Sequence, residues 1–355
     1  MRRFGLGFLI LAAVAGVGPA AAAEGGSSTD PPPSLEYRPQ RVVIPEPRAP
    51  TPAPPVAIFR EAIGGFGIGK ESFDGPVDVA ADASGDFYVL DAGNNRVQKF
   101  DKFSNYKFTW GSSGSRVGEF RNPGAILVDS SRSDFHYIYV VDTGNHRVQI
   151  FQFETQTGKI AFFESWGGLG SRDGDFKHPR DIVLDGEGYV WVLDPGNERV
   201  QKFKFEPEKM TGPKVSFVES WGKIFGSRGG NFDGLVSIGW SRDRFGYIFL
   251  LGAGCLVQRF QTDGTWVSSW PAIAPESGLC SPARIEIDNE NDLVYVLDAG
   301  NGLFERFNLE GQFLFALRGA ERSFSKPLGM AVNPDRDEYL VADTENNIVQ
   351  KFTLR

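Results

Sequence analysis

The chain contains 355 residues with a formal net charge of −8, and 41% of the residues are hydrophobic. An acidic chain without a run of Lys and Arg repels phosphate backbones, which argues against a nucleic-acid partner. The 43 glycines favour many tight turns, and the apolar content is enough for a core without metal or disulfide help.

The first 23 residues follow the pattern of a secretory signal peptide. Two arginines precede an apolar stretch at residues 4–17, and three alanines at 21–23 place small residues before the expected mature start at Glu24. An uncleaved anchor is the alternative, because residues 4–23 carry almost no charge. Pro19 and the alanines favour cleavage, so we expect an exported protein, periplasmic or secreted, that is not inserted in the membrane.

Residues 24–55 form a proline-rich linker with ten prolines. Such a segment buries too little apolar area to fold and is expected to act as an extended, disordered spacer. Within it, Leu35–Pro45 carries one aromatic and several aliphatic side chains. Two interpretations fit this stretch: a docking peptide for a partner, or a linker with incidental apolar residues.

The remainder, residues 56–355, repeats one short motif six times. The first copy is DAGNNRVQKF at Asp91–Phe100, and an alternating apolar run precedes it. Alternation at period two predicts a half-buried strand, and Asp-x-Gly-Asn supplies residues that tolerate positive φ in a hairpin. The later copies begin at Asp142, Asp194, Leu251, Asp298 and Asp343.

Each of the first five units contains four strand candidates, which we call a to d. In the first unit they begin at Val77, Asp86, Asn95 and Tyr106. The sixth unit lacks a strand d, and residues 57–73 align with the strand d and following loop of other units. We therefore predict an all-β, six-bladed β-propeller of four-stranded blades, closed by an N-terminal strand that completes the last blade.

The repeat resembles the NHL repeat over the whole of residues 56–355. Its pattern is F-x-x-P-x-x-[IV]-x-[VL]-D, a short gap, then [YV]-V-x-D-x-x-N-x-R-[VI]-Q-x-F. The fourth copy departs from it at Leu251, Gly254 and Leu256, and the fifth has Leu303 in place of the Arg. The resemblance implies the propeller fold but leaves any function of those two turns in doubt.

Enzymes similar to this family include amidating lyases with a histidine-bound zinc, metal-dependent lactonases and streptogramin lyases. The three histidines here are His136, His146 and His178. They fall in adjacent blades and not around the axis, so we expect no shared metal and no cofactor. We also find no nucleophile placed beside a histidine, which leaves no catalytic residues to assign.

The position two residues after the start of each strand a is expected to face the mouth of the central channel. Its polar occupants could hold a cation or a zwitterion, or Arg284 could pair with a carboxylate in a solvent-filled channel. Across the six blades the occupants are Asp78, Ala125, Asp181, Ser237, Arg284 and Gly329.

The d–a loops of three blades repeat Gly-Ser-Arg, ending at Arg116, Arg172 and Arg228, with Lys70 in a similar place. These arginines are candidate contacts for an acidic partner, or are solvated. The interval from turn Arg to strand-d Trp grows from 14 residues in blade 1 to 19 and 22 in blades 2 and 3. We place this extra length in two c–d hairpins on the opposite face.

Cys255 and Cys280 are the only cysteines. They lie in turns that open on the same face of neighbouring blades, and an exported protein meets an oxidising compartment. We predict a disulfide between them, with two free thiols as the alternative.

Together these features favour an exported, non-catalytic propeller that serves as a protein-binding or scaffold module. The expected partner is another exported or membrane-associated protein, and the propeller is expected to be monomeric within the complex. The alternative is a metal-dependent lyase or hydrolase with its site at the channel mouth, near Asp78 and Asp181.

Overall fold

A computed structural model describes residues 57–222, 230–242, 246–272, 280–318, 323–333 and 337–354. The expected signal peptide and the linker lie outside these residues, as does Arg228. Within the described ranges, no helix has the length and apolar character needed to cross a membrane.

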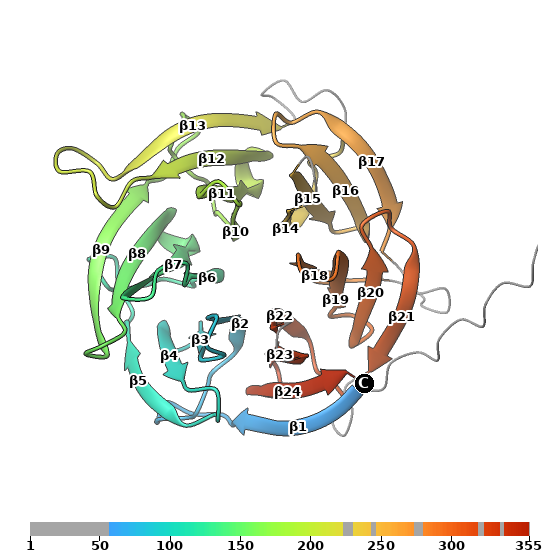
Figure 1. Cartoon of the computed structure of the whole chain (residues 1–355), viewed down its shortest axis with the longest axis horizontal. Coiled ribbons are helices and arrows are strands. Elements are labelled where there is room, and N and C mark those ends of the chain that lie inside the picture. The colour runs from blue at the N-terminus through green and yellow to red at the C-terminus, as the bar shows by residue number, and fades with distance from the viewer. Residues whose placement is uncertain are drawn as a thin grey trace, which may run out of the picture. The chain divides into compact units, whose positions relative to one another are not determined.

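The described chain forms six four-stranded antiparallel sheets arranged in a ring (Figure 1). Strand a of each sheet is innermost and contacts strand a of both neighbouring sheets. Blade 1 consists of β2 (Pro76–Ala81), β3 (Phe87–Asp91), β4 (Arg96–Phe100) and β5 (Tyr106–Trp110). Blade 2 consists of β6 (Ala125–Asp129), β7 (Phe135–Asp142), β8 (Arg147–Glu154) and β9 (Lys159–Gly167). Blade 3 consists of β10 (Asp181–Leu184), β11 (Tyr189–Asp194), β12 (Arg199–Phe205) and β13 (Val215–Gly222).

The second half of the ring follows the same plan. Blade 4 consists of β14 (Leu235–Ser241), β15 (Tyr247–Gly252), β16 (Leu256–Gln261) and β17 (Trp266–Pro271). Blade 5 consists of β18 (Pro282–Asp288), β19 (Leu293–Asp298), β20 (Leu303–Asn308) and β21 (Phe313–Arg318). Blade 6 consists of β22 (Pro327–Asn333), β23 (Glu338–Asp343), β24 (Ile348–Leu354) and the N-terminal β1 (Ala57–Gly64). Single 3-10 turns, Thr143–Asn145 and Pro195–Asn197, precede β8 and β12.

The ring closes as the sequence predicted. Strand β1 lies outermost in blade 6 and pairs antiparallel with β24, from Ala57 opposite Leu354 to Gly64 opposite Ile348. The two ends of the propeller therefore hold one sheet together, and closing a sheet in this way removes an exposed edge.

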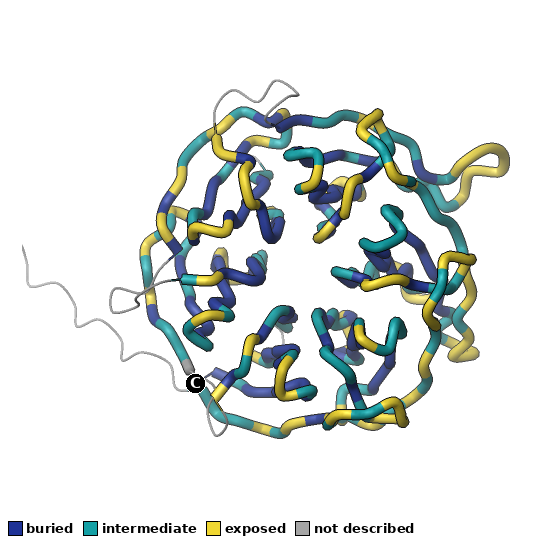
Figure 2. The backbone as a smooth tube through the Cα atoms, turned by 180° about the vertical axis from the view of Figure 1, so that it is seen from behind, coloured by how far each residue is buried: buried dark blue, intermediate teal, exposed yellow. Residues whose placement is uncertain are grey.

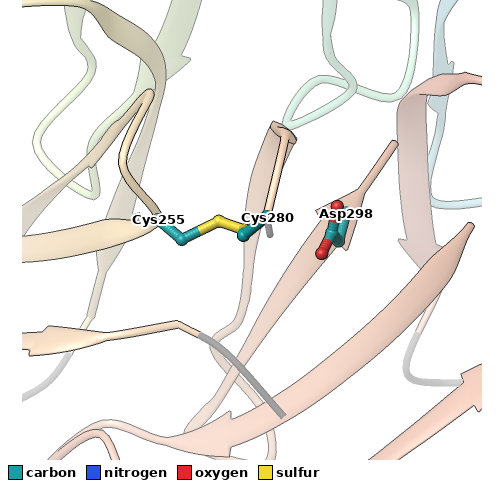
Figure 3. A group of neighbouring side chains, drawn as sticks. All are labelled: Cys255, Cys280 and Asp298. Carbon is teal, nitrogen blue, oxygen red and sulfur yellow. A yellow bond between two sulfur atoms is a disulfide. The ribbon is translucent and has the colours of Figure 1, made fainter. Parts of the chain in front are cut away.

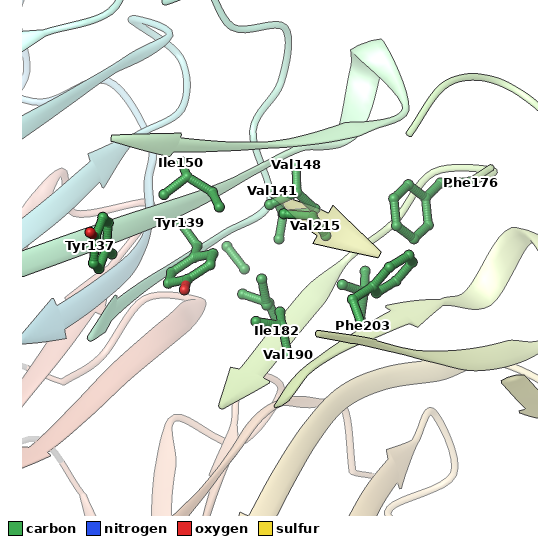
Figure 4. Close-up of a cluster of buried hydrophobic side chains, with 12 residues drawn as sticks. Tyr137, Tyr139, Val141, Val148, Ile150, Phe176, Ile182, Val190, Phe203 and Val215 are labelled. Carbon is green, nitrogen blue, oxygen red and sulfur yellow. The ribbon is translucent and has the colours of Figure 1, made fainter. Parts of the chain in front are cut away.

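The buried residues lie mainly in the inner strands of each sheet, and the outer strands are more exposed (Figure 2). The core lies between adjacent sheets. Between blades 2 and 3, for example, Tyr139 and Ile150 pack with Ile182, Val190 and others in one apolar cluster (Figure 4). Burial of this kind contributes roughly 25 cal/mol per Å² of apolar surface, so packing between sheets stabilises the ring.

The repeated Asp-x-Gly-Asn-x-Arg motif builds the b–c turns. In blade 1, Asp91 accepts hydrogen bonds from Asn94 Nδ2 at 2.9 Å and from Arg96 Nε at 2.7 Å. The Arg96 guanidinium then donates to the backbone oxygens of Gly69 and Ser72 in the preceding d–a loop, each at 2.8 Å. Arg147 and Arg199 make the same contacts in blades 2 and 3. The motif is therefore a structural device that holds each d–a loop on its turn.

The b–c turns and d–a loops share one end of the propeller, which we call the turn face. The a–b and c–d connections share the other end, which we call the hairpin face. On the turn face, the residue before each motif Arg has a positive φ, and in blades 1 and 2 it contacts the entry of the next blade. Asn95 accepts from the Asn122 N–H at 2.9 Å, and His146 Nδ1 accepts from the His178 N–H at 3.0 Å. Neighbouring blades are thereby joined at this position.

Candidate functional site

The residues expected at the channel mouth do converge in the structure. Asp78, Asp181, Ser237 and Arg284 come from four different innermost strands and are all largely buried. The Arg284 Nη1 lies 2.5 Å from Asp181 Oδ1 and 3.3 Å from Asp78 Oδ2. Arg284 therefore pairs with two carboxylates, as one of the alternatives from the sequence stated.

The polar members of this ring also bond to the next blade. Asp78 Oδ2 accepts from the Ile126 N–H at 2.9 Å, and Asp181 Oδ2 accepts from the Ile238 N–H at 2.9 Å. Ser237 donates its hydroxyl to Asp181 Oδ2 at 2.5 Å. The carboxylate oxygens are thus occupied by protein donors, and the ring joins adjacent inner strands.

Gly329, the blade 6 member of the ring, fits the same arrangement. Gly329 lies so close to Asp78 that a Cβ at this position would come within 2.4 Å of the Asp78 Cα. A larger residue at position 329 would therefore displace the backbone of blade 1. Glycine is therefore needed here for the close approach of two inner strands.

Negative charge exceeds positive charge in the channel. Glu286 Oε2 lies 3.8 Å from Arg284 Nε, so one guanidinium faces three carboxyl groups. Burial raises the pKa of Asp78 to about 7, although Arg284 acts in the opposite direction. Burial likewise raises the pKa of Glu286 to about 7. Burial opposes the charge on Arg284, but Asp181 and Asp78 outweigh it and raise its pKa, so Arg284 stays cationic.

A cavity of about 270 Å³ lies at the turn-face mouth of the channel, above this cluster. It is lined by residues of all six blades, among them Val77, Arg180, Val236, Ala283 and Leu328. A separate cavity of about 160 Å³ lies toward the hairpin face and includes Glu286 and Trp240. Arg284 lines both cavities, so the ion-pair cluster separates the two halves of the channel.

The sequence analysis did not identify Arg180 as a candidate site residue. It sits one residue before the predicted ring position, where the other five blades carry Val77, Gly124, Val236, Ala283 and Leu328. Comparing this neighbouring position across the six copies would have revealed a single cation among small and apolar residues.

The Gly-Ser-Arg loops also have a structural role. The backbone oxygens of Arg116 and Arg172 accept from the turn arginines, while both side chains are exposed. Gly69, and not Lys70, is the counterpart of these two arginines, because Arg96 donates to the Gly69 oxygen. Lys70 therefore stands one position away from the place expected for it.

The same loops carry exposed apolar side chains that the sequence interpretation overlooked. Phe66 is 77% exposed and Ile68 82%, in the loop before blade 1. Val117 is 57% exposed and Leu169 71%, in the next two d–a loops. Consecutive loops are linked through the b–c turns, so these four residues follow one arc of the turn face.

On the hairpin face, the extra residues of blades 2 and 3 are used in two ways. In blade 2 they lengthen β8 and β9 to 8 and 9 residues, against 5 each for β4 and β5. In blade 3 they also form a longer connection, in which Glu208 pairs with Arg132 of blade 2 at 2.7 Å. Both partners are well exposed, so this pair contributes little to stability.

The predicted disulfide between Cys255 and Cys280 is present (Figure 3). It joins the b–c turn of blade 4 to the entry of blade 5, at the position where Asn95 and His146 make hydrogen bonds in other blades. Asp298 lies beside the two sulfur atoms. Because the sulfurs are bonded to each other, this trio offers no thiolate to a metal.

The histidines occupy separate structural positions. His146 and His178 pack with their ring centroids 4.4 Å apart on the turn face. His136 lies in β7 with Nδ1 3.4 Å from Asp82 Oδ2, near the hairpin face. The three therefore do not form one cluster.

Comparisons with known proteins agree with this architecture. The model of the NHL repeat matches residues 73–100 and 324–352, in blades 1 and 6. Protein brain tumor of Drosophila melanogaster is 29% identical over 137 residues, which are 39% of this chain and 12% of that protein. NHL repeat-containing protein 3 of Homo sapiens is 28% identical over 94 residues, 26% of each chain. The chain thus matches only a small part of these curated relatives.

A streptogramin B lyase structure has a TM-score of 0.54 with 13% identity, covering 83% of this chain and 98% of that one. At this identity the likeness shows the fold alone. The repeat motif, the matched repeats and the closed ring of six sheets agree with one another. The chain therefore carries NHL repeats, and its repeated units are the blades of a six-bladed β-propeller.

Proposed function

We propose that this protein is an exported, non-catalytic binding module that holds another exported or membrane-associated protein on its turn face. NHL-repeat propellers are protein-binding modules, which supports the general class. The observation that carries the choice of face is the arc of exposed Phe66, Ile68, Val117 and Leu169.

Such side chains are costly to leave in water, and clustered exposed apolar groups mark interaction sites. The d–a loops that carry them are held rigidly by the turn arginines, so the arc needs little ordering when a partner binds. Arg116 and Arg172 stand in the same loops with exposed side chains. Arginine beside apolar groups is typical of interface composition and suits a partner with acidic residues around an apolar centre.

The test compares two matched triple variants of the exported chain. Phe66→Ser, Ile68→Ser and Leu169→Ser together remove the three most exposed residues of the arc, while Phe103→Ser, Met210→Ser and Val218→Ser remove exposed apolar residues elsewhere. Proteins crosslinked to the wild type in the native compartment are identified by mass spectrometry. Loss of the same partner in the first variant and its retention in the second is the expected result. Equal recovery with both variants would overturn the choice of face.

Export is tested separately from binding. The protein is expressed with its own N-terminus, the cells are fractionated, and the first residue of the exported form is determined. We expect export and a mature chain that begins at Glu24. Retention in the cytoplasm, or a membrane-bound chain with residues 1–23 intact, would contradict this part of the proposal.

A further inference from the structure

The mouth of the channel is surrounded by a second ring of residues, one position before the buried polar ring. Five of its members are apolar or glycine, and Arg180 is the single cation. Gly124 of the adjacent blade packs closely against this position, because a Cβ there would lie 3.2 Å from the Arg180 backbone oxygen. The ring therefore offers an apolar wall with one positive group.

Arg180 lies beside two cavities at the mouth. It lines the cavity of about 270 Å³ above the ion-pair cluster, and also a shallower one of about 600 Å³ over blades 5 and 6. Ala283 and Leu328 line both cavities too, so the two spaces adjoin. Lys326 lines the shallower one. Arg180 thus stands between two adjoining hollows at the centre of the turn face.

Within the described part of the chain, no hydrogen bond or ion pair is made by the Arg180 guanidinium. The carboxylates beneath it are already bonded, since Asp181 accepts from Arg284, Ser237 and two backbone N–H groups. Burial lowers the pKa of Arg180, with the charge of Asp181 acting in the opposite direction. Arg180 is nevertheless exposed at the mouth, so an anion that enters the cavity can reach its guanidinium directly.

The surroundings limit which anion fits. A planar carboxylate matches the two-pronged geometry of one guanidinium. A doubly charged phosphate would be repelled by Asp78, Asp181 and Glu286, which outnumber the single cation Arg284 below. The apolar wall of Val77, Val236, Ala283 and Leu328 would take a compact apolar group on the same ligand.

We propose that the channel mouth binds a monocarboxylate with a compact apolar body, its carboxylate on Arg180 and its body against the apolar wall. This site is distinct from the arc of apolar residues on the d–a loops and does not depend on a partner binding there. Two sources carry the same chemistry: a free small acid, or the C-terminal carboxylate of a protein chain.

The test uses phenylacetate as the probe, titrated into the full exported chain and followed by ligand-observed NMR. Saturable binding is expected at about millimolar concentration or below, given the size of the probe. Phenylacetamide, which has the same shape without the charge, is expected to bind at least about tenfold more weakly. Arg180→Gln is expected to weaken phenylacetate binding by about 10- to 100-fold. Arg242→Gln, which changes an exposed arginine on the hairpin face, is expected to leave it unchanged.

Ala283→Leu provides a second variant that fills the apolar wall and keeps Arg180, and it is expected to weaken binding as well. A short peptide with a C-terminal phenylalanine, free or amidated, distinguishes the sources. Tighter binding of the free-acid peptide than of phenylacetate indicates a chain terminus, and binding of phenylacetate alone indicates a small acid. Absence of saturable binding by both carboxylates, equal binding of phenylacetamide, or binding unaffected by Arg180→Gln in the folded variant would overturn the proposal.

Discussion

Replacement of Arg284 by methionine tests whether the channel cluster is held by one cation. The change keeps much of the side-chain volume but removes the charge that lies 2.5 Å from Asp181 and 3.3 Å from Asp78. Removing one partner of a buried ion pair leaves an uncompensated charge and typically costs about 3–5 kcal/mol of unfolding free energy. We expect a loss of that order at pH 8, where the carboxyl groups are ionised.

The loss should shrink as the pH falls. Folded Asp78 and Glu286 have pKa values raised to about 7, from ordinary values near 4, so the folded state binds more protons than the unfolded state between these limits. Stability of the wild type therefore falls as pH rises from about 4 through 7. Without Arg284 these pKa values rise further, because its charge lowers both of them. Arg284→Met is thus most destabilising above pH 7 and least destabilising near pH 5.

Urea unfolding of wild type and Arg284→Met at pH 5, 6, 7 and 8, followed by tryptophan fluorescence, measures this difference. Arg242→Met is the control, because its pair with Glu290 is well exposed on both sides and should contribute little. A difference in unfolding free energy that is constant with pH, or below about 1 kcal/mol at pH 8, would refute the reasoning.

Four further outcomes follow from the same structure. Asp78→Asn should flatten the fall of unfolding free energy between pH 5 and 8, because the group with the raised pKa is removed; an unchanged slope in urea titrations would assign the fall to other groups. Gly329→Ala should cost about 1–3 kcal/mol, since its Cβ would collide with the Asp78 backbone, whereas Gly158→Ala meets no atom within 4 Å and costs only its φ strain. Reduction of the Cys255–Cys280 disulfide, which closes a loop of sequence separation 25, should cost about 3 kcal/mol; an unchanged melting temperature in reductant would contradict this. Addition of Ca²⁺ or Zn²⁺ after chelation should shift the melting temperature by less than about 1 °C, since Asp78 and Asp181 are already bonded; a saturable rise of several degrees would support the metal-dependent lyase or hydrolase instead.

The sequence predicts the architecture well because each blade repeats the same pattern of strand-forming and turn-forming residues. The alternating apolar runs and the Asp-x-Gly-Asn turn specify strand, turn and strand, and among the described residues the surplus strand at Ala57–Gly64 completes blade 6. The clustering of Asp78, Asp181, Ser237 and Arg284 also follows, because equivalent positions of inner strands must meet at the axis. Their mutual bonding does not follow, since pairing across the channel depends on side-chain reach and not on the repeat.

The disulfide shows what a departure from the repeat can tell. Cys255 occupies the positive-φ position of its turn, where Asn95, His146 and Asn347 bond to the next blade. The turn of blade 4 lacks the Asp and Arg of the motif, at Leu251 and Leu256. The covalent link therefore takes the place of a hydrogen bond at this junction, and the sequence could locate it only because both cysteines fall in turns of one face.

Arg180 escaped prediction for a related reason. A search for polar residues at a single register position finds the buried ring, where charges are paired and their chemistry is largely satisfied. The position one residue earlier is apolar or glycine in the other five blades. Averaged over the six copies it is therefore interpreted as an apolar lining, and Arg180 is overlooked. In a closed ring, a single cation among apolar neighbours has no equivalent partner in the next blade, and symmetry alone cannot pair it. Positions where one copy differs in charge from the other five are therefore the places to search for ligand contacts in a propeller, and Arg180 is the clearest of them in the described chain.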